Sequence, residues 1–174
     1  MTHTKTSLYS KLLHIAEWYA IAREIIYRRI QYDCEVQMEM ENLVFPLLYI
    51  IRHEIELSLK ISCEYRHISR EGNHDLKYLW EQLNIEQILL DMEEEDYRIS
   101  LSAAKETIDR FITNDPRWTE FRYLTKGLSP IIDFKDFVYD DTENNDSIDD
   151  DLMGFEVFYE YCEGTIKYLN QFHS

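Results

Sequence analysis

Apolar residues recur along this chain at intervals of three and four, the spacing of one face of an α-helix. The first such stretch covers residues 7–31, and a second, more apolar one covers residues 42–66. A short stretch ends near Leu83, and two longer ones cover residues 85–113 and about 152–172. The pattern predicts an all-α protein, built as an up-and-down bundle of four to five helices.

Polar residues predict where these helices begin. Ser7 is a candidate N-cap of the first helix and Asn42 of the second, since short polar side chains accept hydrogen bonds from free backbone N–H groups. Pro46 would then lie near the first turn, where its missing N–H is tolerated. Asp75 or Asn73 is predicted to cap the short third helix.

The region before the last helix departs from the helical pattern. Residues 121–139 are rich in aromatic side chains, and apolar and polar residues partly alternate there, which is compatible with a small β-hairpin. Residues 136–151 are predicted to form an acidic surface loop. This loop lacks the glycine and glutamate spacing of an EF-hand, so no calcium site is expected. With no repeat or linker, we expect one domain over residues 1–174.

Composition adds two constraints. The 4 glycines and 3 prolines provide few turns, which favours long helices. The net charge is −16, and residues 136–163 contain 11 acidic residues without any lysine or arginine. Proteins bind phosphate backbones through lysine and arginine, so RNA as a partner is disfavoured by charge. An acidic segment could instead meet a basic protein or maintain solubility.

Cysteine usage and hydropathy predict the compartment. Cys34, Cys63 and Cys162 form no CxxC pair, so reduced thiols are expected. The first residues lack a signal-peptide segment, and the longest apolar run, Leu43–Ile51, is too short to cross a bilayer. We expect a soluble cytoplasmic protein that does not enter membranes.

The first helix carries apolar and basic residues outside its main stripe. Trp18 and Ile25 are predicted to widen that stripe. Arg23, Arg28 and Arg29 lie towards its margins, where they could meet an acidic partner or a phosphate. A solvated helix edge is the favoured interpretation.

Ionisable residues gather in the second helix. Arg52, Glu56 and Lys60 are spaced by four, which favours a ladder of ion pairs on one helix face. The alternative is a cleft in which Arg52 binds phosphate and His53 transfers a proton. The ladder is the favoured interpretation.

His74 and Asp75 resemble the paired ligands of HD-type metal phosphohydrolases. Such sites need further His and Asp ligands, and no spacing in this chain provides them, so no metal and no cofactor are predicted. Capping of a helix by Asp75 is the simpler role. No GxSxG, P-loop or GxGxxG motif is present.

Three segments together resemble bacterial HEPN-like helical proteins: FPLLYIIRHEIELSLK, GNHDLKYLW and NDPRWTEFRY. The resemblance covers about residues 45–125. It implies a helical bundle, often dimeric, from toxin–antitoxin, abortive-infection or other defence systems. Active members of this family are metal-independent ribonucleases. In them an arginine is followed, after four to six residues, by a histidine. The arginine stabilises the phosphate, and the histidine takes part in proton transfer.

This chain departs from that motif, because its nearest pair, Arg70 and His74, is separated by three residues. We therefore expect a non-catalytic HEPN-like module that forms a homodimer or binds a protein partner. The alternatives are a metal-independent ribonuclease and a small-molecule or nucleotide sensor. The candidate catalytic residues would be Arg52, His53 and His74. The predicted structural polar cluster comprises Glu56, Lys60, Asp75 and Arg122.

Overall fold

The computed structural model describes residues 5–33, 37–68, 74–84, 95–114, 137 and 148–171. The regular elements within these ranges are all helices, which confirms the prediction of an all-α protein for this part of the chain. The helices are α1 (Lys5–Asp33), α2 (Gln37–Tyr65), α3 (Leu76–Leu83), α5 (Glu95–Asn114) and α6 (Ile148–Asn170).

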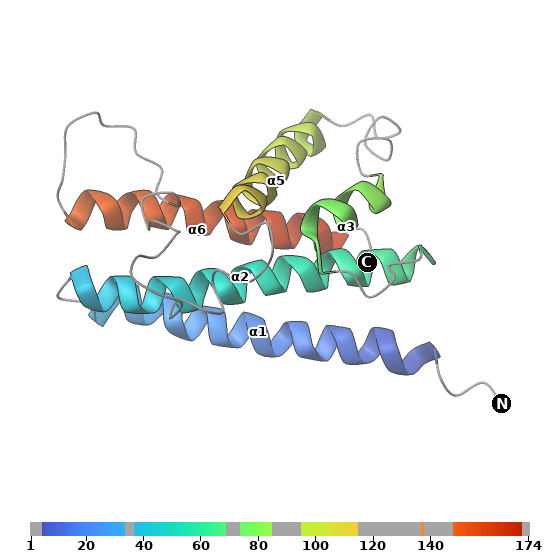
Figure 1. Ribbon diagram of the computed structural model, residues 1–174, viewed down its shortest axis with the longest axis horizontal. Helices are drawn as coiled ribbons and strands as arrows, with labels where there is room; N and C mark the ends of the chain where they lie inside the picture. The colour runs from blue at the N-terminus through green and yellow to red at the C-terminus, as the bar shows by residue number, and fades with distance from the viewer. Residues whose placement is uncertain are drawn as a thin grey trace.

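Three long helices, α1, α2 and α6, lie side by side (Figure 1). The helices α1 and α2 are antiparallel, since Leu12 near the start of α1 packs with Leu57 and Ile61 in the second half of α2. By contrast, α2 and α6 run in the same direction. The short α3 contacts α2 and α5, and α5 lies obliquely across α6 (Figure 1).

The central element is α2. Every residue from Glu54 to Cys63 is buried, because α1, α3 and α6 pack around this part of the helix. The polar members of this run are satisfied internally. Ser62, for example, donates to the carbonyl of Ser58 at 2.9 Å. A helix enclosed on most sides must also neutralise its charged residues within the fold.

Aromatic rings join α5 to α6. Phe137 lies between Phe111 of α5 and Phe158 of α6, with ring centroids 5.6 and 5.4 Å away. Tilted and edge-on arrangements at such distances stabilise cores beyond the area they bury. The helix α6 turns one face to the core. This face comprises Phe155, Phe158, Tyr159, Cys162, Ile166 and Leu169, which are all buried.

The predicted start of the second helix was wrong. Because α2 begins at Gln37, Asn42 is not its cap and Pro46 lies inside the helix. Pro46 is exposed, whereas Val44, Leu47 and Leu48 beside it are buried. Burial of these neighbours holds the helix together where proline removes a backbone hydrogen bond.

The remaining predictions concern the β-hairpin, Arg122, the acidic loop and membrane insertion. The hairpin over residues 121–139 lies outside the described residues except for Phe137, and so does Arg122. Residues 148–151 of the predicted acidic loop belong instead to α6. In the part of the chain that the structure describes, no helix is both long and apolar enough to span a membrane.

Asp75, rather than Asn73, caps α3. Its carboxylate accepts from the backbone N–H of Lys77 at 2.9 Å and of Tyr78 at 3.3 Å. At the other end, Asn84 adopts a left-handed conformation with φ of 46° and terminates the helix. The cap fixes where α3 begins, and therefore where His74 lies.

We expect Asp75→Ala to lower the free energy of unfolding by about 1 kcal/mol, since two N–H groups lose their acceptor. Asp75→Asn is the matched control, because an asparagine oxygen can still cap. Urea denaturation followed by circular dichroism measures both. Equal losses in the two variants would contradict the capping role.

Candidate functional site

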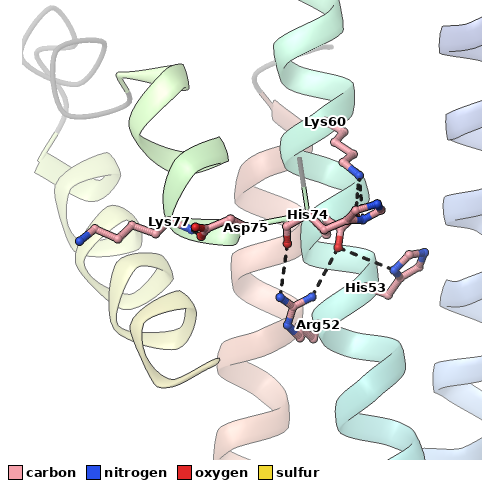
Figure 2. A network of polar contacts seen from close by, with 7 residues as sticks. Arg52, His53, Lys60, His74, Asp75 and Lys77 are labelled. Atoms are coloured by element: carbon pink, nitrogen blue, oxygen red, sulfur yellow. Dashed lines mark hydrogen bonds and ion pairs between the residues drawn. The ribbon is translucent and has the colours of Figure 1, made fainter. Parts of the chain in front are cut away.

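Glu56 is the centre of the predicted polar cluster, because its carboxylate contacts Arg52, Lys60 and His74, three side chains that Figure 2 shows together. Lys60 Nζ donates to its Oε1 at 2.6 Å, and His74 Nδ1 lies 2.8 Å from the same oxygen. On the other side, Arg52 Nη1 donates to Oε2 at 3.4 Å. The predicted ladder of Arg52, Glu56 and Lys60 is therefore present, and His74 joins it from the segment before α3.

Arg52 also binds the backbone beyond α2. Its Nη2 donates to the carbonyl oxygen of His74 at 3.4 Å (Figure 2). Since Glu56 receives the His74 ring, two contacts tie α2 to the start of α3. The structure thus brings together Arg52 and His74, two of the three candidate catalytic residues.

The exposed fraction of the side chains differs sharply across this cluster. The side chains of Arg52 and Glu56 are 2% and 1% exposed, and that of Lys60 is 11% exposed. The His74 side chain is 52% exposed. An external phosphate would have to displace internal partners of Arg52 to reach its guanidinium. The arrangement is best suited to holding α2 and α3 together, with one histidine at the surface.

His53, the third candidate, packs towards α1. Its ring lies 4.5 Å from Tyr19 and 6.2 Å from Tyr49, centroid to centroid. Burial lowers the pKa of His53, and Lys60 lowers it further, although Glu56 opposes both. His53 Nδ1 is 4.0 Å from Glu56. A neutral, enclosed imidazole of this kind is a packing group.

Asp75 and Arg122 were also predicted to belong to this polar cluster. Asp75 caps α3, so the adjacent His74 and Asp75 serve different elements. Arg122 lies outside the described residues. Within the described ranges, no group of His, Cys, Asp and Glu side chains is placed to hold a metal ion.

A second polar cluster was missed by sequence reasoning. Arg23 of α1 is 8% exposed, which contradicts the expected solvated edge. Its Nε donates to Glu54 of α2 at 2.8 Å. Its Nη1 donates to the hydroxyl of Tyr159 at 2.7 Å and to Glu163 at 2.8 Å, both on α6. One guanidinium therefore joins three helices.

Burial shifts the pKa of several groups in this second cluster, which is centred on Arg23. Burial alone lowers the pKa of Arg23, but Glu54 and Glu163 outweigh it, so the net pKa is raised. Burial also raises the pKa of Glu54, against the effect of Arg23. Burial and nearby carboxylates raise the pKa of Tyr27 to about 12, and its ring stacks on Tyr159 at 3.6 Å.

The described cysteines are not activated nucleophiles. Cys63 and Cys162 are buried thiols. Burial raises the pKa of Cys162 well above its ordinary value, whereas reactive thiols need a lowered pKa.

A cavity of about 500 Å³ lies between α3 and α5 rather than around Arg52. Its lining mixes lysines, acids and apolar groups. The lining residues are Lys77, Trp80, Glu81, Asn84, Lys105, Ile108, Asp109 and Ile112.

Comparisons with protein-family models, with curated proteins and with solved structures find no match to this chain. The HEPN relationship therefore stays a prediction, and function must be inferred from geometry.

We expect Arg23→Ala to lower the free energy of unfolding by about 3–5 kcal/mol, because Glu54 would remain buried without its cation. Arg23→Leu combined with Glu54→Leu should lose less than the single change. Arg28→Ala is the control on the same helix, since Arg28 pairs with Glu24 at the surface, and it should have no measurable effect. Urea denaturation measures all three; an equal loss in the double variant would contradict the burial argument.

The lowered pKa of His53 predicts a dependence of stability on pH. Below its ordinary value of 6.5, the unfolded chain takes up this proton before the folded one does. The contribution of His53 is therefore complete above pH 6.5 and is lost as the pH falls below it. His53→Gln should show a shallower loss of unfolding free energy between pH 7.5 and 5.5. Identical slopes would show that His53 does not titrate this way.

Proposed function

We propose that this chain is a helical protein–protein interaction module rather than a catalyst. The observation that carries the proposal is a row of large apolar side chains on the solvent-facing side of α1. We call it the α1 outer ridge. It consists of Trp18, Ile21, Ile25 and Tyr32, which are 59%, 60%, 64% and 75% exposed.

The α1 outer ridge lies on one helix face. Its members are separated by three, four and seven residues, so they line up along the helix. The opposite face carries Arg23 and Ile30, which are buried against the rest of the molecule. Single exposed apolar residues are ordinary, but a row of four marks a surface that another molecule covers.

Burial of Arg52 supports a non-catalytic role. In HEPN ribonucleases an arginine stabilises the substrate phosphate. Here the Arg52 guanidinium donates to Glu56 and to the carbonyl of His74. Breaking these contacts would take from the buried Glu56 carboxylate one of the two cations that pair with it, Arg52 and Lys60, which is costly.

We extend the proposal to the setting that the resemblance implies, a bacterial defence or toxin–antitoxin system. Two of the three segments that carry the resemblance contribute Glu56 and His74, which contact each other across α2 and the start of α3. This contact supports treating these segments as one structural unit. It supports no particular partner.

A metal-independent ribonuclease remains the second candidate, and His74 is the observation that favours it. Its side chain is half exposed, and its ring is held 2.8 Å from a buried carboxylate. A surface imidazole oriented by a carboxylate is suited to proton transfer.

We expect no cleavage of RNA by the purified chain in EDTA, even at high protein concentration. Fluorescent RNA of mixed sequence, analysed by gel electrophoresis, measures this. Cleavage that disappears in His74→Ala but persists in Lys77→Ala would establish the ribonuclease and overturn the non-catalytic proposal. Lys77 is a suitable control because it is an exposed cation three residues after His74, and Figure 2 shows its side chain directed away from Arg52 and Lys60.

We also expect Trp18→Glu and Ile25→Glu to abolish the association of this chain with itself or with a protein encoded beside it. Light scattering of the purified chain, alone and mixed with that protein, measures association. Met153→Glu is the control, since Met153 of α6 is 64% exposed but lies outside the α1 outer ridge. Unchanged association in both ridge variants would overturn the proposal.

A further inference from the structure

We infer that the cavity between α3 and α5 is a binding site for a free α-amino acid with a large apolar side chain. The inference goes beyond the proposed interaction role, because this cavity is built by other helices than the one that carries the α1 outer ridge. Its volume of about 500 Å³ is in the range of small-molecule sites in proteins. The chemistry of its lining defines the ligand.

The two helices turn faces of the same polarity pattern to the cavity. On each helix the lining residues follow one another at spacings of three, four and seven, so they share one face. Each face begins with a lysine, continues with an apolar residue after three positions and has an acid after four. The two faces are Lys77, Trp80, Glu81 and Asn84 on α3, and Lys105, Ile108, Asp109 and Ile112 on α5.

The floor of the cavity is apolar. Trp80 is 8% exposed and Ile108 is 1% exposed, and Ile112 beside them is partly buried. A ligand side chain that covers these groups removes apolar surface from water, which favours binding. The indole of Trp80 adds a flat surface against which a ring or a branched chain packs well. The floor therefore favours a ligand with a large apolar side chain.

The rim of the cavity is charged, and its charges balance. Lys77, Glu81, Lys105 and Asp109 are all exposed, so two cations and two anions surround the apolar floor. Figure 2 shows the Lys77 side chain directed from the start of α3 towards α5. The formal charge of the rim is zero, which matches a ligand that is itself a zwitterion.

An α-amino acid has the required pair of charges. Its ammonium and carboxylate groups are attached to one carbon, so they need an acid and a cation close to each other. Side chains four residues apart on a helix are about 5–6 Å apart at their Cβ atoms. Lys77 and Glu81 on α3 have this spacing, and so do Lys105 and Asp109 on α5. Charge-assisted hydrogen bonds of this kind are among the stronger polar contacts.

Ligands with one sign of charge fit the rim less well. A nucleotide brings several negative charges, which would approach Glu81 and Asp109. A fatty acid would use the lysines and leave both acids without a cation. The balanced rim therefore selects a zwitterion over both classes.

Both walls of the cavity are held by the rest of the fold. On α2, Glu56 lies 2.8 Å from the ring of His74, three residues before Lys77. On α5, Phe111 packs against Phe158 of α6, with ring centroids 5.9 Å apart. A site between fixed walls loses little conformational entropy when a ligand binds.

Isothermal titration calorimetry of the full chain tests the ligand class, with L-phenylalanine as the probe. We expect binding that weakens at least about tenfold for each of three analogues that lack one feature. These are 3-phenylpropanoate without the ammonium, 2-phenylethylamine without the carboxylate, and glycine without the apolar side chain. Absence of binding at millimolar L-phenylalanine would overturn the inference. So would equal affinity for L-phenylalanine and either phenyl analogue.

A change of rim charge tests the site. Glu81→Gln/Asp109→Asn keeps the size of both side chains and leaves only the two lysines charged. This variant should bind L-phenylalanine more weakly and 3-phenylpropanoate more tightly, so that the preference reverses. Glu106→Gln is the control on α5, since Glu106 is exposed, pairs with Arg110 and is not among the described lining residues. It should change neither affinity, and an unchanged preference in the double variant would contradict the site. Circular dichroism checks the fold.

Nuclear magnetic resonance locates the probe independently. The indole N–H signals of Trp80 and Trp18 are assigned with Trp80→Phe and Trp18→Phe. L-Phenylalanine should shift the Trp80 signal and leave the Trp18 signal in place. A shift confined to Trp18 would place the probe on the α1 outer ridge and overturn the inference. The proposed interaction role is tested separately by the ridge variants, so either proposal can fail while the other stands.

Discussion

The rest of this structure depends on neutralising the charges that α2 carries into the core. Arg52, Glu54, Glu56 and Lys60 are all buried in one helix. Ions removed from water must be paired and hydrogen-bonded within the protein, since an isolated buried charge costs several kcal/mol. Glu56 is paired by Lys60 and Arg52 on its own helix, whereas Glu54 depends on Arg23 of α1. The positions of the neighbouring helices are thus constrained by the side chains that α2 requires.

This constraint also limits what the Glu56 cluster can do. A site that binds phosphate needs a cation open to solvent, but here the guanidinium of Arg52 is enclosed by Glu56 and the His74 carbonyl. The contacts that fix α3 on α2 are the ones that occupy the arginine. His74 is exposed because it precedes the cap of α3, at the surface end of the same cluster. Its position is compatible with proton transfer. However, Arg52, which would have to bind a phosphate beside it, already donates to Glu56 and to the His74 carbonyl.

Local features were predictable from the sequence, and contacts between distant segments were not. The pairing of Glu56 with Lys60 follows from a spacing of four on one helix, and Asp75 as a cap follows from its place before an apolar run. The pairing of Arg23 with Glu163 joins residues far apart in the chain, and no periodicity reveals it. One signal was present: Arg23 lies four residues after Tyr19 and three before Ile26, within the inward stripe. A charged residue in an apolar stripe is a candidate for a buried ion pair.

The helix α1 shows how an ambiguous pattern is resolved by structure. Trp18 and Ile25 were expected to widen the inward stripe, and they instead form a second apolar face, with the ridge directed to solvent. From sequence alone, two apolar faces on one helix are indistinguishable from one broad face. The burial of Arg23 decides between them, because it fixes which side of α1 faces α2 and α6. The same buried arginine that neutralises the core therefore also determines which apolar face of α1 remains for a partner.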